Sequence, residues 1–146
     1  MLHDMPSDAS ITTHNVKHGD VLVFGTDGVW DNLSSADVLK IVSKYMTGFD
    51  GWVTSNATNK RRGGELVPGK KLREITSDGG IAVRDGTIQR LIATAVAAEA
   101  KMTSMDQKRD GPFAREVHKY YPSEDFHGGK VDDICVIVAV IVDGLA

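Results

Sequence analysis

The feature that most constrains the fold is an unbroken apolar run at residues 134–142, which reads ICVIVAVIV. It contains Ile, Val, Cys and Ala without polar alternation, a pattern typical of a strand covered on both faces inside a layered fold. The run is far shorter than the roughly 20 residues that cross a bilayer, so no membrane span is predicted. Two acids, Asp132 and Asp133, stand directly before it. We therefore expect a central strand with carboxylates at its start.

Two shorter runs near the beginning of the chain also predict strands. Residues 11–16 and 21–26 are rich in β-branched side chains and flank a polar turn at 17–20, which predicts a β-hairpin. From about residue 47 to 85 the periodicity vanishes and glycines multiply. This stretch is predicted to be a long flexible loop, either an insertion or a substrate-facing flap.

Three helices are predicted between the strands. Ser34, followed three residues later by Asp37, is a capping-box start for an amphipathic helix that runs to about residue 46. Helical spacing returns at residues 88–102, among strong helix formers. Pro112 then opens a short helix that stops before Pro122. Strands, helices and a final strand in this order indicate an α+β domain.

Composition excludes several classes of protein. The 146 residues, 41% of them hydrophobic, fit one domain with a real core. The net charge of -3 gives no pull toward nucleic acid. The single cysteine, Cys135, cannot form an internal disulfide, which predicts a reducing, intracellular compartment. Its place in the apolar run predicts a buried and unreactive thiol.

The candidate chemistry lies where strands end in acids. Residues 21–32 read VLVFGTDGVWDN, so an apolar strand runs into Asp27, and Gly28 lets the backbone turn sharply beside it. Taken alone, Asp27 is explained equally well as a turn cap, and Asp132 with Asp133 is better explained as a solvated turn. Together, strand-end acids far apart in sequence can converge at one end of a sandwich. Their oxygen ligands suit hard cations such as Mg²⁺ or Mn²⁺.

Other motifs weigh less. Residues 64–71 imitate a phosphate-binding loop, but they end in Lys where Ser or Thr is required and follow no predicted strand. The basic residues 60–62 are predicted to be a solvated charge run rather than a substrate contact. His14 and His18 have the spacing of a helical zinc pair but flank a predicted turn, so they are predicted to be surface residues. His118 and His127 are predicted to be solvated side chains, with no acid or base role assigned to either.

Two motifs carry a family resemblance. Residues 19–38, GDVLVFGTDGVWDNLSSADV, resemble the segment of protein phosphatase 2C in which a strand leads into Asp-Gly, an aromatic residue and another Asp. Residues 128–142, GGKVDDICVIVAVIV, resemble the family's closing motif, an Asp-Asn or Asp-Asp pair before the last strand. The double acid, with PSDAS at 6–10 and GPFAREVHKYYP at 111–122, is most similar to the family's mitochondrial branch, especially in fungi. This branch implies a mitochondrial location.

The resemblance implies an αββα layered β-sandwich flanked by helices, with two Mn²⁺ or Mg²⁺ ions at one end. It maps residues 1–146 onto the C-terminal part of the domain, because the family's upstream Asp-Gly-His-Gly segment, Glu ligand and phosphate-binding Arg find no counterpart. It places metal ligands at Asp27 and Asp132. Gly28 would support the first ligand, and Asp133 would orient the site.

The implied activity is that of a metal-dependent protein serine/threonine phosphatase, in which a metal-activated water hydrolyses phosphoserine or phosphothreonine in a phosphoprotein. Asp27 and Asp132 supply about two negative charges against about four positive charges on a metal pair. The chain alone is therefore expected to bind metal weakly. Asp31 receives no role from the resemblance. The runner-up is a noncatalytic phosphatase-like module that binds a partner through residues 47–85, and the presence of both strand-end acids favours the enzyme.

Overall fold

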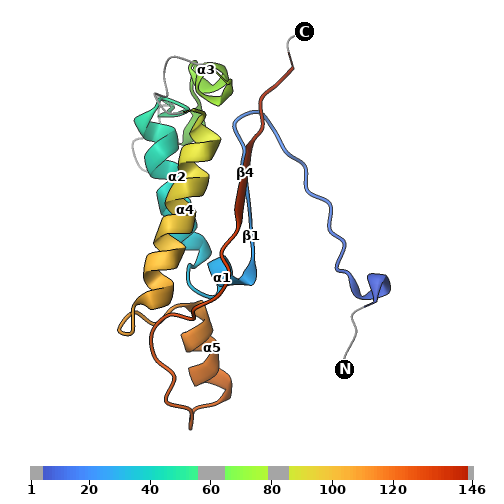
Figure 1. Cartoon of the computed structure of the whole chain (residues 1–146). Helices are drawn as coiled ribbons and strands as arrows, with labels where there is room; N and C mark the ends of the chain where they lie inside the picture. Colours follow the sequence, from blue (N-terminus) through green and yellow to red (C-terminus); the bar gives the residue numbers. More distant parts are fainter. Residues whose placement is uncertain (1–4, 56–64, 79–85, 145–146) are drawn as a thin grey trace.

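The computed structural model describes residues 5–55, 65–78 and 86–144, in which helices pack on one face of an antiparallel strand pair (Figure 1). Mixed helices and antiparallel strands confirm the predicted α+β class. The elements, in chain order, are a 3-10 turn at Pro6–Asp8, β1 (Val21–Gly25), α1 (Asp27–Trp30), α2 (Ser35–Gly48), β2 (Trp52–Thr54), β3 (Leu66–Pro68), α3 (Leu72–Thr76), α4 (Ile88–Met105), α5 (Pro112–Tyr120) and β4 (Val136–Val140).

Strands β1 and β4 pair along their whole length, with Val21 opposite Val140 and Gly25 opposite Val136. Alternate side chains of both strands pack against the helices that form the core. The other face of the pair is open among the described residues, since Phe24 and Ile137 lie opposite each other and are 56% and 62% exposed. The prediction that residues 134–142 are covered on both faces is therefore wrong.

Cys135 lies just before β4 and is exposed. The predicted burial of its thiol is wrong for the same reason, because the helices cover only one side of the strand pair.

The predicted helices are confirmed. Ser34 caps α2 through the expected reciprocal bonds: the Asp37 amide donates to Ser34 Oγ at 3.2 Å, and the Ser34 amide donates to Asp37 Oδ2 at 3.0 Å. Within the described ranges, every helix falls short of the length or hydropathy of a membrane-spanning helix. The buried apolar core joins α1–α4 and comprises Val29, Leu33, Val38, Val42, Met46, Leu72, Ile75, Ile88, Ile92, Val96 and Ala100.

The predicted N-terminal hairpin is wrong. The turn at 17–20 forms, but residues 11–16 form no strand and lead away from the strand pair (Figure 1). The backbone bonds of the turn go to the C-terminal end of the chain: the Gly19 amide donates to the Ile141 carbonyl, and the Ile141 amide donates to the Asp20 carbonyl, both at 2.8 Å. The partner of β1 is thus β4, far along the sequence.

The stretch from about 47 to 85 contains three short elements that the sequence did not predict. β2 and β3 pair antiparallel, with Trp52 opposite Pro68, and α3 follows. Residues 56–64 and 79–85, with the basic cluster 60–62, lie outside the described residues. The flexibility of the whole stretch stays a prediction.

Candidate metal centre

The antiparallel pairing of β1 and β4 places the residues that follow β1 next to the residues that precede β4. Asp27 is the first residue of α1, and Asp132 lies shortly before β4. One carboxylate oxygen from each of Asp27, Asp31 and Asp132 lies within 4.8 Å of the other two. We call these three residues the acid cluster. The structure brings together the two predicted ligands and adds Asp31, to which the sequence assigned no role.

Backbone contacts hold the two halves of the acid cluster together. The Thr26 hydroxyl donates to the Asp133 carbonyl at 2.7 Å and accepts from the Cys135 amide at 3.1 Å. A Cβ at Gly28 would lie 2.4 Å from the Asp133 carbonyl oxygen and 3.1 Å from Asp132 Cβ, so only glycine permits this approach. The exposed Asp133 contributes through its backbone, since its amide also donates to Asp132 Oδ1 at 2.9 Å.

Asn32 is a buried link between the same two segments, only 1% exposed. Its Nδ2 donates to the carbonyls of Gly28 and Lys130, both at 2.8 Å, and its Oδ1 accepts from the Lys130 amide at 2.9 Å. Both the donor and the acceptor atom of this side-chain amide therefore have partners, as burial requires. Sequence reasoning missed this role, because Asn32 stood in the motif only as a neighbour of the acids.

Lys130 places a positive charge beside the acid cluster. Its Nζ lies 2.6 Å from Asp31 Oδ2 and 3.2 Å from Asp132 Oδ2. The hydrogen bond to Asp31, followed by that to Asp132, raises the pKa of Lys130. The Asp133 amide, followed by Lys130, lowers the pKa of Asp132. Nothing in the sequence analysis singled out Lys130.

The composition of the acid cluster fits a hard divalent cation. Its donors are all carboxylate oxygens, the ligands that Mg²⁺ and Mn²⁺ prefer. Three carboxylates and the Lys130 ammonium leave two net negative charges, which match the charge of one divalent ion. A pair of divalent ions would need further negative donors.

The histidines have different surroundings from one another. His118 is partly buried and its Nε2 lies 2.6 Å from the Phe126 carbonyl oxygen, so the prediction that it is a solvated side chain is wrong. It lies on α5, and Phe126 belongs to the loop that runs from the end of α5 back toward β4, which we call the return loop. His14 is exposed, and His18 accepts a hydrogen bond from the Asp143 amide at 3.0 Å. Among the described residues, neither His14 nor His18 belongs to a group that could hold a metal ion.

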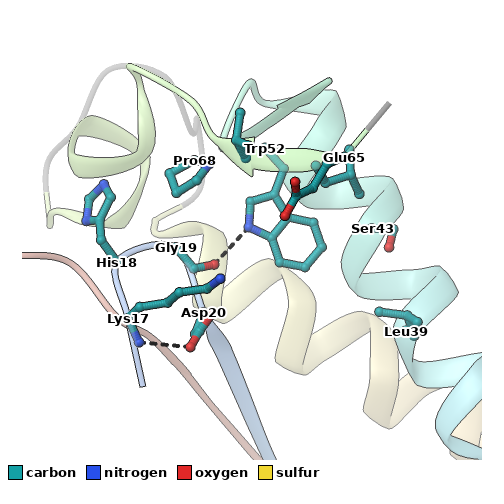
Figure 2. A pocket seen from close by; sticks show the side chains of 11 residues that line it. Lys17, His18, Gly19, Asp20, Leu39, Ser43, Trp52, Glu65 and Pro68 are labelled. Atoms are coloured by element: carbon teal, nitrogen blue, oxygen red, sulfur yellow. Dashed lines mark hydrogen bonds between the residues drawn. The ribbon is translucent and has the colours of Figure 1, made fainter. Parts of the chain in front are cut away.

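A cavity of about 460 Å³ lies between the turn that precedes β1, the β2–β3 hairpin and α2 (Figure 2). Trp52 forms part of its wall, and the Trp52 Nε1 donates to the Gly19 carbonyl at 2.8 Å. Gly19 precedes β1 and Asp27 follows it, so the cavity and the acid cluster lie at opposite ends of this strand. The cavity therefore takes no part in the candidate metal centre.

Comparisons with known proteins give several relatives and one similar fold, although no family model matches the chain. The chain is 31% identical over 129 residues to the putative protein phosphatase 2C 23 of Oryza sativa subsp. japonica, covering 87% of this chain and 29% of that protein. It is 26% identical over 138 residues to the probable protein phosphatase 2C 55 of Arabidopsis thaliana, covering 94% of this chain and 21% of that protein. The X-ray structure of the photosystem II phosphatase PBCP matches with a TM-score of 0.55 and 23% identity, over 92% of this chain and 41% of that chain. The chain thus spans less than half the length of each.

Proposed function

This chain belongs to the protein phosphatase 2C family, and we propose that it supplies part of the active site of a metal-dependent protein serine/threonine phosphatase. The proposed reaction is the hydrolysis of phosphoserine or phosphothreonine in a phosphoprotein by a water molecule. The observation that carries the proposal is the convergence of Asp27 and Asp132, which are far apart in sequence and have carboxylate oxygens within 4.8 Å of each other.

Asp27 and Asp132 are the proposed ligands of Mn²⁺ or Mg²⁺, with Asp31 as a third donor. Bound Mn²⁺ or Mg²⁺ would lower the pKa of the attacking water and offset the charge of the phosphoryl oxygens. The chain's own part is to hold the donors in place. Gly28 allows the backbone before β4 to approach α1, and Lys130 offsets part of the carboxylate charge.

We propose that a two-ion site needs donors beyond the acid cluster. The cluster and Lys130 carry two net negative charges, whereas two divalent ions carry four positive charges. The chain spans 29% of the length of its rice relative. A segment that corresponds to the rest of that length would supply the missing donors.

The alternative is a noncatalytic phosphatase-like module that binds a partner through residues 47–85. One observation favours it: the cavity beside Trp52 is lined by Glu65–Pro68, which belong to this stretch (Figure 2). This cavity lies at the end of β1 opposite the acid cluster. Such a module would bind its partner with or without Asp27. The enzyme would need Asp27 for turnover.

We also propose an intracellular, mitochondrial location. It is supported by the single cysteine and by the resemblance of residues 6–10 and 111–122 to the mitochondrial branch of the family. A fluorescent fusion of the full-length protein that collects outside mitochondria would contradict this placement.

The test is hydrolysis of a phosphothreonine peptide in the presence of Mn²⁺. The 146-residue chain is assayed alone and mixed with the N-terminal segment of the rice relative, as wild type, as Asp27→Asn and as Asp50→Asn. Asp50 is the matched control, because its carboxylate is 57% exposed and pairs with Lys71 on the surface. We expect turnover in the mixture, its loss with Asp27→Asn and its retention with Asp50→Asn.

The other outcomes separate the alternatives. Turnover by the chain alone that disappears with Asp27→Asn would show that no further donors are needed. Turnover that Asp27→Asn leaves unchanged would overturn the metal assignment. A mixture that forms a complex without any turnover would favour the noncatalytic module.

A further inference from the structure

A second group of side chains with metal-binding atoms lies around α5. One ligand atom from each of Asp110, His118 and His127 lies within 4.8 Å of the other two. We call these residues the histidine cluster. They come from the residues just before α5, from its last turn and from the loop that follows it. Helix α5 lies toward the α1 end of the strand pair (Figure 1).

The histidine cluster is held by contacts that its members make with the return loop. Asp110 Oδ1 accepts from the Gly128 amide at 2.8 Å, and Asp110 Oδ2 lies 3.1 Å from His127 Nδ1. The rings of His118 and His127 lie beside each other, with 4.8 Å between their centroids and an angle of 58° between their planes. The Gly128 amide, followed by His127, lowers the pKa of Asp110, so its carboxylate stays available as an anionic donor.

His118 uses one ring nitrogen in a hydrogen bond, which leaves the other ring nitrogen free to bind a metal. Its Nε2 lies 2.6 Å from the Phe126 carbonyl oxygen, and a carbonyl can only accept, so Nε2 carries the proton. The lone pair then sits on Nδ1. An imidazole whose other nitrogen donates to a backbone carbonyl is the usual arrangement of a metal-bound histidine.

We propose that Asp110, His118 and His127 bind a divalent transition-metal ion of the Zn²⁺ class. Two imidazoles and one carboxylate favour Zn²⁺, Co²⁺ or Ni²⁺ over Mg²⁺, the reverse of the all-oxygen acid cluster. Zn–N distances of about 2.0–2.1 Å put tetrahedral donors roughly 3.4 Å apart. The ligand atoms of the three residues lie within 4.8 Å of one another, so small side-chain rotations would bring them to that spacing. The 58% exposed side chain of His127 has room for such a rotation, and a water molecule would complete the coordination.

The bound ion would fix the position of the segment that precedes β4. His127 and Gly128 stand directly before the segment that carries Lys130 and Asp132. An ion at the histidine cluster ties this segment to α5 through side chains as well as through the Asp110–Gly128 bond. The inference does not depend on the proposed phosphatase activity, since it concerns different donors and a different class of ion.

The test is calorimetric titration of the untagged chain with Zn²⁺ in excess Mg²⁺. We expect one Zn²⁺ per chain, and a loss of affinity on the order of 100-fold in the His118→Gln/His127→Gln variant. The matched control is His14→Gln/His18→Gln, which removes two histidines outside the cluster and should change the affinity by less than about twofold. Asp27→Asn/Asp132→Asn should also keep Zn²⁺ binding.

A second measurement needs no variant and so does not depend on how a variant folds. In the wild-type chain, Zn²⁺ should shift the imidazole nitrogen resonances of His118 and His127 and leave those of His14 and His18 in place. Equal shifts at His14, His18, His118 and His127 would mean adventitious surface binding and would overturn the inference. So would Zn²⁺ affinity that follows Asp27 and Asp132 instead of the histidines.

Discussion

The acid cluster and the histidine cluster each bring three ligand atoms within 4.8 Å of one another, but they differ in donors and in scaffold. The acid cluster joins two segments that are held together by hydrogen bonds between the buried Asn32 side chain and the backbone of Lys130, 98 positions further along the chain. The histidine cluster is built from one helix and its return loop, with His127 58% exposed. Ligand spacing alone therefore predicts neither the preferred ion nor the dependence on the fold. The first cluster requires β1–β4 pairing, and the second is largely local.

The largest expected effect comes from removing the buried link of the acid cluster. Asn32→Ala would leave the Gly28 carbonyl and both backbone groups of Lys130 without their partner. Buried polar groups without partners cost about 1–3 kcal/mol each, so we expect a loss of about 3 kcal/mol in the free energy of unfolding. Urea unfolding followed by circular dichroism measures it.

The control for this change is Asn15→Ala, because Asn15 is exposed and its replacement should stay within about 0.5 kcal/mol of wild type. Under conditions where Asn32→Ala is still folded, Mn²⁺ binding at the acid cluster should weaken more than Zn²⁺ binding at the histidine cluster. Equal stability of the two Asn variants would break the comparison, because the acid cluster would then need no buried link.

The difference between the clusters also explains how much of the fold the sequence predicts. The helices were predicted because their signals are local, as with the Ser34–Asp37 capping box of α2. The partner of β1 was not, because the nearest β-rich run, residues 11–16, offered an equally good local pattern. The pairing that forms connects Val21 to Val140, and no local signal reports contacts at that separation.

The residues of the candidate site also fall into two groups, those with a local sequence signal and those whose role depends on contacts between distant segments. Asp27 and Asp132 were found because a strand-end acid beside glycine is visible in a short window. Thr26, Asn32 and Lys130 were missed because their roles exist only across the β1–β4 junction. For Asn32 one sequence signal was available: it directly precedes Leu33, which is buried in the core. A polar residue in that position is expected to be buried and hydrogen-bonded.

An intermediate effect tests the electrostatics of the acid cluster. Lys130 Nζ lies within 3.2 Å of both Asp31 and Asp132, so a cation must share these carboxylates with it or displace it. In Lys130→Gln one competing charge is gone. Because the pairing is partly screened by solvent, the effect is modest, and Mn²⁺ should bind about fivefold more tightly, as measured by electron paramagnetic resonance of free Mn²⁺.

The matched control for Lys130 is Lys40→Gln, on the exposed side of α2, which should leave Mn²⁺ affinity within about twofold of wild type. Zn²⁺ binding at the histidine cluster should not change with Lys130→Gln. Weaker Mn²⁺ binding in this variant would show that Lys130 organises the carboxylates, and the competition argument would then be wrong.

The smallest expected effect concerns the ion pairs that hold the start of the histidine cluster against the helices. Arg109, next to Asp110, donates to Asp37 Oδ1 at 3.2 Å and to Glu99 Oε1 at 2.8 Å. The Ser34 hydroxyl, and to a lesser degree Arg109, lower the pKa of Asp37 below its ordinary value. Because the folded state depresses this pKa, the stabilisation is present above the unfolded value and is lost as the pH falls through the folded value.

Asp37→Asn should therefore cost about 0.5–1 kcal/mol at pH 7, reduced by solvent screening of the 38% exposed carboxylate. In urea unfolding at a series of pH values, this difference should shrink from about pH 5 downward and vanish below the folded pKa. A difference that persists undiminished at low pH would mean that shape, rather than charge, makes Asp37 stabilising, and the histidine cluster would then depend on the helices less than its Arg109 contacts indicate.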